Sequence, residues 1–277
     1  MLPSESDFAD WIGRSFTRHE PVAERLVEGL RATLGPWLAD QDAPPGLHWC
    51  LCPDMVGVDQ LGRDAHPRTG IFLPALPFKR RMWAGGTLDL TGRFQPGDLV
   101  TRTTTIESIR FRQGRSGPLG FVAVRHLYAV GGQTVLDEVH DIVYRPDPAP
   151  GAVVAQPPIA PDLGAPLDTM ELTPDPVLLF RFSALTFNGH RIHYDHPYAT
   201  AVEGYDGLVV HGPLQAVLML NLATRALGRQ PQSFRYRGLS PLTVGKPIAV
   251  EAHGGQGGLA LRVRITGGPV TMEAAAV

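Results

Sequence analysis

Three things are scarce in this 277-residue sequence: long apolar runs, an excess of one charge, and cysteine. No stretch of 18 consecutive apolar residues occurs, so we expect no membrane-spanning helix and no membrane partner. The 25 Lys and Arg side chains nearly balance the 27 Asp and Glu side chains, which disfavours a nucleic-acid-binding protein. The start, MLPSESDFADWIG, is polar and acidic and does not match a secretory signal. We therefore expect a cytoplasmic globular protein.

Cysteine occurs only at Cys50 and Cys52, within an apolar run. A disulfide across one intervening residue would be strained, and two ligands fall short of the four in a structural zinc site. We expect both thiols to be reduced and buried.

What the sequence does contain is two similar halves. In the first half, apolar residues at helical spacing predict a helix over 20–34. Proline and glycine then predict an irregular segment from about 39 to 86. Alternating apolar residues between glycine-containing turns predict strands, which we place at 88–94, 98–112, 121–130 and 134–145.

The second half repeats this order after a proline-rich stretch at 146–168, which predicts an extended linker. Helices are predicted at 174–185 and 212–227, and strands at 233–239, 247–254 and 259–266. The repeat indicates duplication of one α+β unit. Because the first copy passes from Gly86 directly into a strand, we expect it to have lost the counterpart of the 212–227 helix. That loss predicts a groove over its part of the sheet, where a small molecule could bind.

A cluster of polar side chains between residues 186 and 196 stands out from the rest of the sequence. His190, His193 and His196 are three residues apart, which could place metal ligands on one helix face. However, Gly189 and Pro197 favour a loop, and the zinc motifs His-Glu-x-x-His and paired cysteine are missing. We therefore expect no metal.

General acid–base chemistry on a carbonyl compound fits this cluster better than nucleophilic catalysis, because Ser183 lacks the Gly-x-Ser-x-Gly elbow. Histidine titrates near neutrality, so it can take and return a proton. The helix predicted to start at Gly212 offers N–H groups that can stabilise negative charge on a thioester oxygen. Gly212 would let a ligand approach the backbone closely, and Pro213 suits a first helical turn.

The segment 182–214, FSALTFNGHRIHYDHPYATAVEGYDGLVVHGPL, resembles the MaoC-like (R)-specific enoyl-thioester hydratases and dehydratases, in particular their double hot-dog branch. Other stretches that resemble this branch are 72–86, 114–124 and 140–145. The resemblance implies an α+β double hot-dog fold, in which a long helix packs on an antiparallel sheet. We divide the chain into a degenerate first copy at 1–146, a linker at 147–168 and a second copy at 169–277. The resemblance further implies a hydro-lyase without a metal or redox cofactor.

The family motif places an Asp five residues before the catalytic His and an Asn three before it. In this sequence His193 occupies the catalytic position, while Asn188 and His190 stand where the family has Asp and Asn. We predict that His193 is the base, Asn188 its positioning partner and the Gly212 N–H the oxyanion donor, since an amide cannot act as a base. The secondary catalytic candidates are Asp195, His190 and His211. A turn-capping role is the alternative for Asp195.

Basic side chains are enriched between Lys79 and Arg125, either as a solvated strand face or as a site for CoA phosphates or an acyl carboxylate. The substrate-binding candidates are Arg80, Arg81, Arg115 and Arg191. The expected reaction is reversible hydration of a short, branched dicarboxylic enoyl-CoA, such as mesaconyl-C4-CoA or itaconyl-CoA, to citramalyl-CoA.

Three further functions stay open. The first is a fatty-acid-synthesis dehydratase acting on a carrier-protein thioester, and the second is a thioesterase on the same fold. The third is a non-catalytic acyl-thioester-binding subunit, because Asn188 replaces the family Asp. A sheet edge in each half makes a homodimer plausible.

Overall fold

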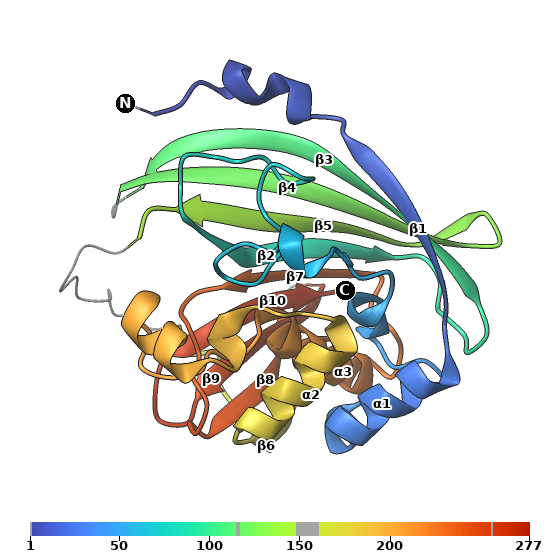
Figure 1. The fold of residues 1–277 in the computed structure, drawn as a ribbon. Helices are drawn as coiled ribbons and strands as arrows, with labels where there is room; N and C mark the ends of the chain where they lie inside the picture. The colour runs from blue at the N-terminus through green and yellow to red at the C-terminus, as the bar shows by residue number, and fades with distance from the viewer. Residues whose placement is uncertain (1, 115–116, 148–160, 256) are drawn as a thin grey trace.

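The computed structural model describes residues 2–114, 117–147, 161–255 and 257–277. In the first half the strands are β1 (Ser15–Pro21), β2 (Arg80–Leu90), β3 (Leu99–Gly114), β4 (Gly117–Val130) and β5 (Gln133–Arg145). In the second half they are β6 (Asp168–Leu172), β7 (Ser233–Gly238), β8 (Ile248–Gly255), β9 (Gly258–Ile265) and β10 (Val270–Ala276). All of them belong to one antiparallel sheet (Figure 1).

The strand order shows the duplication directly. It runs β1-β3-β4-β5-β2 in the first half and β7-β10-β9-β8-β6 in the second, which is the same pattern read in the opposite direction. The two copies meet where β2 pairs with β7, from Gly85 opposite Arg237 to Asp89 opposite Ser233. A side chain at Gly86 would lie 2.5 Å from the hydroxyl oxygen of Tyr236, so this junction requires glycine. The predicted α+β double hot-dog fold is confirmed.

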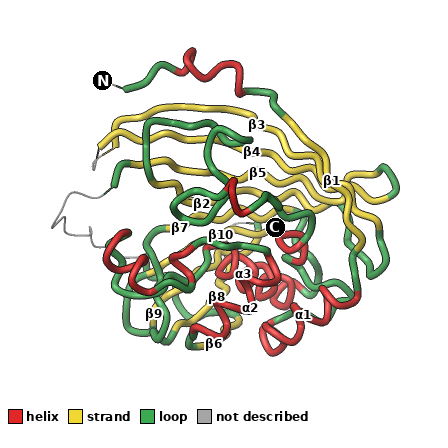
Figure 2. Tube along the Cα trace, viewed as in Figure 1, coloured by secondary structure: helices red, strands yellow, loops and turns green. Residues whose placement is uncertain are grey.

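Three α-helices pack beside the second half of the sheet: α1 (Glu24–Leu34), α2 (Pro176–Thr186) and α3 (Gly212–Leu227) (Figure 2). Every residue of α3 from Leu214 to Thr224 is buried, and the helix contacts β6, β8, β9 and β10. Among the described residues, no helix is long and apolar enough to cross a membrane. The shorter helical turns are Glu5–Trp11, Gly35–Trp37, Leu47–Cys50, Val58–Gln60, Arg191–His193 and Tyr198–Val202.

The first copy has only short helical turns, Leu47–Cys50 and Val58–Gln60, before β2, where the second copy has α3. This confirms the predicted loss of the helix. The irregular segment fills that space: Leu47, Cys50 and Leu51 are buried in the same core as the sheet residues. Both cysteines are buried and free, as predicted. A cavity of about 310 Å³ lies in the same half, between the irregular segment and the turn after β2, lined by Asp40, Gln41, Asp42, Ala43, Arg93, Phe94 and Gln95. The small-molecule groove expected over this half stays a prediction.

Several predicted boundaries are wrong at the sheet edges and at β2. The helix predicted from residue 20 begins at Glu24, because Glu20 and Pro21 pair with β3 as the end of β1. The strand predicted at 88–94 is β2 and starts at Arg80, inside the segment predicted to be irregular. The short strands β1 and β6 and the final strand β10 were not predicted. Most of the predicted linker, residues 148–160, lies outside the described residues.

A buried charged network lies inside the first half, centred on Glu138 of β5, which is fully buried. Its Oε1 accepts hydrogen bonds from the Trp49 indole (2.7 Å) and the Tyr236 hydroxyl (3.2 Å). Its oxygens also lie 2.7 Å from a ring nitrogen of His140 and 3.7 Å from one of His48. Burial opposes ionisation of Glu138, but the two histidines outweigh it and hold the pKa of this carboxyl well below its usual range.

Candidate active site

The loop between α2 and α3 positions the predicted base. The α2 helix ends at Thr186, and Phe187 takes a left-handed conformation (φ 51°), which redirects the chain into the histidine-containing loop. A single helical turn, Arg191–His193, follows. The Val209 N–H donates to the Ile192 carbonyl oxygen (2.9 Å), so this turn is tied to the segment that leads into α3.

His193 is held as a neutral ring with one nitrogen available. Its Nδ1 lies 2.7 Å from the carbonyl oxygen of Val209, so Nδ1 carries the proton and donates it. Nε2 then bears the lone pair, and it makes no hydrogen bond with the residues that the structure describes. Burial lowers the pKa of His193 to about 3, although the Val209 contact favours the charged form. At neutral pH the ring is therefore neutral, with its one proton on Nδ1, and can accept a second proton through Nε2.

The ring of His193 also lies beside the start of α3. It stacks on His211, the residue that precedes the helix, with 3.5 Å between ring centroids and 18° between planes. His211 is fully buried, and its Nε2 lies 2.8 Å from the Ser183 hydroxyl oxygen. The first N–H groups of a helix have no partner within it, so the base and a set of backbone donors lie together here.

Gly212 is the first residue of α3, and its lack of a side chain has a packing reason. A Cβ at this position would lie 2.5 Å from Trp83 of β2. The indole of Trp83 stacks on Tyr236 with ring centroids 4.6 Å apart. The glycine therefore lets an aromatic ring from the first half pack against the helix start. That it also lets a ligand approach the backbone closely stays a prediction. The predicted oxyanion role of its N–H is unaffected.

Asn188 and Asp195 both make local contacts that shape the loop. The Asn188 Oδ1 accepts a hydrogen bond from the His190 N–H (2.9 Å). The Asp195 Oδ1 accepts from the Tyr198 N–H (3.0 Å), and its Oδ2 accepts from the Arg191 guanidinium (2.7 Å). These contacts hold the pKa of Asp195 below its usual value. The capping role considered for Asp195 is thus the one its contacts support, and the carboxylate is committed to it.

The arginines predicted to bind substrate are engaged within the protein where the structure describes them. Arg191 pairs with Asp195 and lies over the Tyr198 ring, 4.1 Å from its centroid. Arg80 is buried and forms an ion pair with Glu203 (2.6 Å) that links the two halves. Arg81 donates to the Pro67 carbonyl oxygen (2.6 Å). Both Arg80 and Arg81 belong to β2 and not to the irregular segment that we predicted from about 39 to 86. Arg115 lies outside the described residues.

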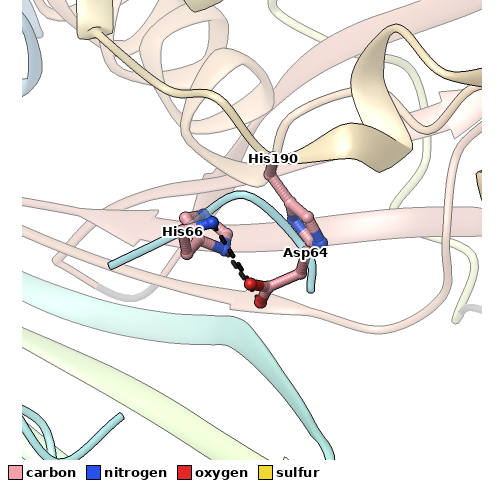
Figure 3. Close-up of side chains that lie close together, drawn as sticks. All are labelled: Asp64, His66 and His190. Carbon is pink, nitrogen blue, oxygen red and sulfur yellow. Dashed lines mark hydrogen bonds and ion pairs between the residues drawn. The ribbon is translucent and has the colours of Figure 1, made fainter. Parts of the chain in front are cut away.

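The structure adds two residues that the sequence reasoning missed, Asp64 and His66. Both come from the irregular segment of the first half and lie against His190 (Figure 3). The Nδ1 of His66 is 3.3 Å from the Asp64 Oδ2, and the ring centroids of His66 and His190 are 4.3 Å apart. One ligand atom from each of Asp64, His66 and His190 lies within 4.8 Å of the others, a spacing at which a metal ion could be held. The metal site considered from the sequence involved His190, His193 and His196 instead.

The four histidines form a row that ends at the helix start. Successive ring centroids are 4.3 Å apart from His66 to His190, 5.4 Å from His190 to His193 and 3.5 Å from His193 to His211. Burial, followed by repulsion from neighbouring rings, lowers the pKa of both His190 and His211. His190, His193 and His211 are therefore neutral rings, which suits proton transfer and not the binding of a free anion.

Comparison with known families agrees with this geometry. The family model described as hydroxyacyl-thioester dehydratase type 2 matches residues 46–244, which span the irregular segment, β2 to β5, the histidine loop and α3. Mesaconyl-C(4)-CoA hydratase of Chloroflexus aurantiacus is 39% identical over 281 residues, covering 95% of this chain and 98% of that protein.

The chain belongs to the hydroxyacyl-thioester dehydratase type 2 family. It is a hydratase or dehydratase of acyl thioesters. A 40% identical match to the mitochondrial type 2 dehydratase of Schizosaccharomyces pombe covers 28% of this chain and 27% of that protein.

Solved structures support the fold. A MaoC-like dehydratase from Phytophthora capsici superposes with a TM-score of 0.70 at 16% identity, covering 99% of this chain and 97% of the other. HtdX of Mycobacterium tuberculosis gives 0.68 at 18% identity, covering 95% and 99%. At these identities the likeness concerns the double hot-dog fold alone.

Proposed function

We propose that this dehydratase-family protein hydrates a short, branched dicarboxylic enoyl-CoA, with mesaconyl-C4-CoA as the preferred substrate and citramalyl-CoA as the product. The identity to a mesaconyl-C(4)-CoA hydratase extends over 95% of the chain and so includes both halves of the sheet. The observation that carries the proposal is the placement of His193: a neutral, buried ring with a free Nε2, stacked beside the start of α3.

This placement supports the following chemistry. Nε2 of His193 takes a proton from water while the water oxygen bonds to the β-carbon of the enoyl group. The π electrons of the double bond move toward the thioester, and negative charge develops on its oxygen. The Gly212 N–H at the start of α3 stabilises that charge without reorganisation. Protonation of the α-carbon completes the hydration, and the reverse sequence is dehydration.

The packing beside the helix start favours a short acyl group over a fatty acyl chain. Trp83 fills the space next to Gly212, and Tyr236 and Trp49 pack against Trp83, with ring centroids 4.6 and 6.2 Å away. A long apolar chain leaving the reacting carbons toward the first half would have to displace these rings. This favours the mesaconyl substrate over the long-chain intermediates of fatty acid synthesis.

A panel of thioesters tests the proposal: mesaconyl-C4-CoA, itaconyl-CoA, crotonyl-CoA, dodecenoyl-CoA and a crotonyl carrier protein. Loss of the conjugated enoyl absorbance, with the product identified by mass, reports hydration. We expect the highest kcat/KM with mesaconyl-C4-CoA. An equal or higher value with crotonyl-CoA would contradict the dicarboxylic part, and a preference for the carrier protein would favour a dehydratase of fatty acid synthesis.

The same panel distinguishes a hydratase from a thioesterase and from a non-catalytic binding subunit. Release of free thiol without hydration would identify a thioesterase. Binding of the thioesters without turnover would identify a non-catalytic subunit. The homodimer and the cytoplasmic location expected from the sequence stay predictions.

A further inference from the structure

The proposed hydration needs a group that protonates the α-carbon. Within the described residues, the histidine loop has no carboxylate available to position such a proton donor. The position where the family has Asp holds Asn188, whose Oδ1 accepts a hydrogen bond from the loop itself. Asp195 is committed to Arg191 and the Tyr198 N–H. The structure brings a different carboxylate to the histidine row, Asp64 of the first half.

Asp64 and His66 sit in a tight turn whose backbone is tied together. The Gly62 N–H donates to the His66 carbonyl oxygen (2.7 Å), and Leu61 bridges to Pro67. Between the two side chains, Ala65 takes a left-handed conformation with φ 64°, which is unfavourable for a residue with a side chain. Backbone strain of this kind persists where the surrounding structure enforces it, and it gathers at functional sites.

The turn is also fastened to the catalytic loop of the second half. The Arg191 N–H donates to the Asp64 carbonyl oxygen (3.0 Å), and the Arg191 guanidinium donates to the carbonyl oxygen of Arg63 (3.2 Å). Gly189 lies close to the turn, because a Cβ there would be 3.2 Å from the Ala65 carbonyl oxygen. Two segments far apart in the sequence are therefore locked together beside the histidine row.

Within the turn, Asp64 holds His66 in a defined orientation. Its Oδ1 accepts the His66 N–H (3.2 Å), and its Oδ2 lies 3.3 Å from His66 Nδ1. With Nδ1 donating to the carboxylate, Nε2 is the ring nitrogen left to exchange a proton. The His66 side chain is 28% exposed, whereas His190 and His193 are buried. Figure 3 shows the His66 ring and the Asp64 carboxylate on one loop, with His190 reaching toward them from the second half.

A metal ion is less suited to this cluster than a proton-transfer role. The Asp64 Oδ2 that would bind the ion faces His66 Nδ1 and lies 3.7 Å from the Arg81 guanidinium. A divalent cation would have to displace the histidine proton and tolerate a positive charge beside it.

We propose that Asp64 and His66 form the second proton-transfer pair of this site, with His66 as a catalytic acid and Asp64 as its positioning residue. This rests on the proposed hydration. As water adds to the β-carbon, His193 takes the water proton and the α-carbon gains the electron pair of the broken π bond. That pair then forms a C–H bond with the proton on His66 Nε2. Each turnover leaves His193 protonated and His66 neutral, and proton exchange with solvent restores both.

The test compares wild type with His66→Gln, Asp64→Asn and Asp64→Glu, using the thioester of the panel that wild type hydrates fastest. The matched control is Asp59→Asn, which removes an exposed carboxylate from the same segment. We expect His66→Gln to lower kcat by about 10²–10⁴-fold, with KM changed by less than about threefold, because proton transfer is lost while binding is retained. Asp64→Asn should lower kcat at least about tenfold, Asp64→Glu should retain more activity than Asp64→Asn, and the control should match wild type.

The pH dependence separates this role from a structural one. Asp64 and His190 face His66, and Arg81 lies beside Asp64. With one acid and one base required, kcat/KM of the wild type in the hydration direction should be bell-shaped, and His66→Gln should lose the alkaline limb. This wild-type measurement stands even if a variant fails to fold.

Four results would overturn the pair: a wild-type profile without an alkaline limb, an unaltered profile in His66→Gln, equal rates for Asp64→Asn and Asp59→Asn, or a stoichiometric metal whose removal abolishes activity. If the wild type hydrates mesaconyl-C4-CoA, any of these four results contradicts the Asp64–His66 pair without contradicting the proposed function. A panel without any hydration contradicts both.

Discussion

The two halves of the sheet have the same strand order but different interiors. The second half surrounds α3, where eight of the eleven buried residues are apolar, and places its histidines in the loop that leads to the helix start. The first half has an irregular segment in place of the helix and buries a carboxylate, Glu138, among aromatic rings and histidines. In place of this helix, the irregular segment of the first half brings Asp64 and His66 against His190 of the other half.

The two copies therefore contribute different residues to the site and to its surroundings. The second copy provides the predicted base, His193, and the N–H groups at the start of α3. The first copy supplies the Trp83 ring against Gly212, the ion pair between Arg80 and Glu203, and the turn that carries Asp64. Stability is expected to depend strongly on the first half, whereas both halves share the proposed chemistry, with His193 in the second half and His66 in the first.

The largest effect on stability is expected at Glu138. Replacing it by Leu removes the acceptor for Trp49 and Tyr236 and leaves the polar groups around it unpaired. We expect Glu138→Leu to lower the free energy of unfolding by about 3–5 kcal/mol, measured by urea denaturation. The control Glu107→Leu removes an exposed partner of Arg125 and should cost less than about 1 kcal/mol. Equal costs would show that the buried network does not stabilise the first half.

The next effect concerns the contact between the two halves at the start of α3. Gly212→Ala places a Cβ against Trp83, and we expect a loss of about 1–3 kcal/mol in unfolding free energy. Gly207→Ala is the control, because its Cβ would meet Thr243 at an ordinary 3.7 Å. Replacing Trp83 by Leu in the Gly212→Ala protein should recover part of the loss. Equal unfolding free energies for the two alanine variants would show that Trp83 does not pack tightly against the start of α3.

The halves should also differ in how pH affects their stability. His193 has a pKa of about 3 in the folded protein, against about 6.5 in an unfolded chain. Between these values the unfolded chain binds more protons, so stability falls as pH decreases from 6.5 toward 3, by at most about 1.4 kcal/mol per pH unit for this ring. The pKa of Glu138 is lowered, so its contribution is present above about pH 4.3 and is lost only as pH falls through its folded pKa.

Burial lowers the pKa of three histidines in the second half (His190, His193 and His211) and of His126 in the first. Between pH 7 and pH 5 the second half should therefore account for most of the change. Urea denaturation at both pH values measures it. His193→Gln should reduce the pH dependence, while His196→Gln, which replaces an exposed ring of the same loop, should leave it as in wild type. An unchanged slope in His193→Gln would contradict the buried, neutral state of that ring.

The smallest effect is expected for the exposed ion pair between Arg237 of β7 and Glu273 of β10, with an N–O distance of 2.7 Å. Because the side chains are 68% and 45% exposed, their coupling should be below about 1 kcal/mol. A double-mutant cycle with Arg237→Ala and Glu273→Ala measures it. A coupling well above this limit would mean that surface charge, and not the buried network, helps to fix the sheet.

The elements that local sequence patterns specify could be predicted. The apolar run of α3, the glycine and proline at its start and the clustered histidines gave the helix, the loop and the resemblance to the family. The edge strands β1 and β6 were missed because short strands with few apolar residues carry little periodic signal. Gly212 was placed at the helix start, but its packing against Trp83 depends on a strand far away in the sequence.

Asp64 and His66 could not be assigned to the site for the same reason. Their segment shows only turn-forming residues, and nothing in it specifies that the chain returns to the histidine loop more than 100 residues later. The two polar residues around Ala65 were the one available signal, since polar side chains in a tight turn between apolar stretches often serve a function.

The role of His193 as the general base is best tested by comparing the hydration of mesaconyl-C4-CoA by His193→Gln and by His140→Gln. His140 belongs to the buried network of the first half, and His193 to the site of the second. We predict that His193→Gln lowers kcat/KM by about 10²–10⁴-fold, because a general base is lost, while folded His140→Gln stays within about threefold of wild type. A His193→Gln enzyme within threefold of wild type, or a larger loss in His140→Gln, would contradict the account.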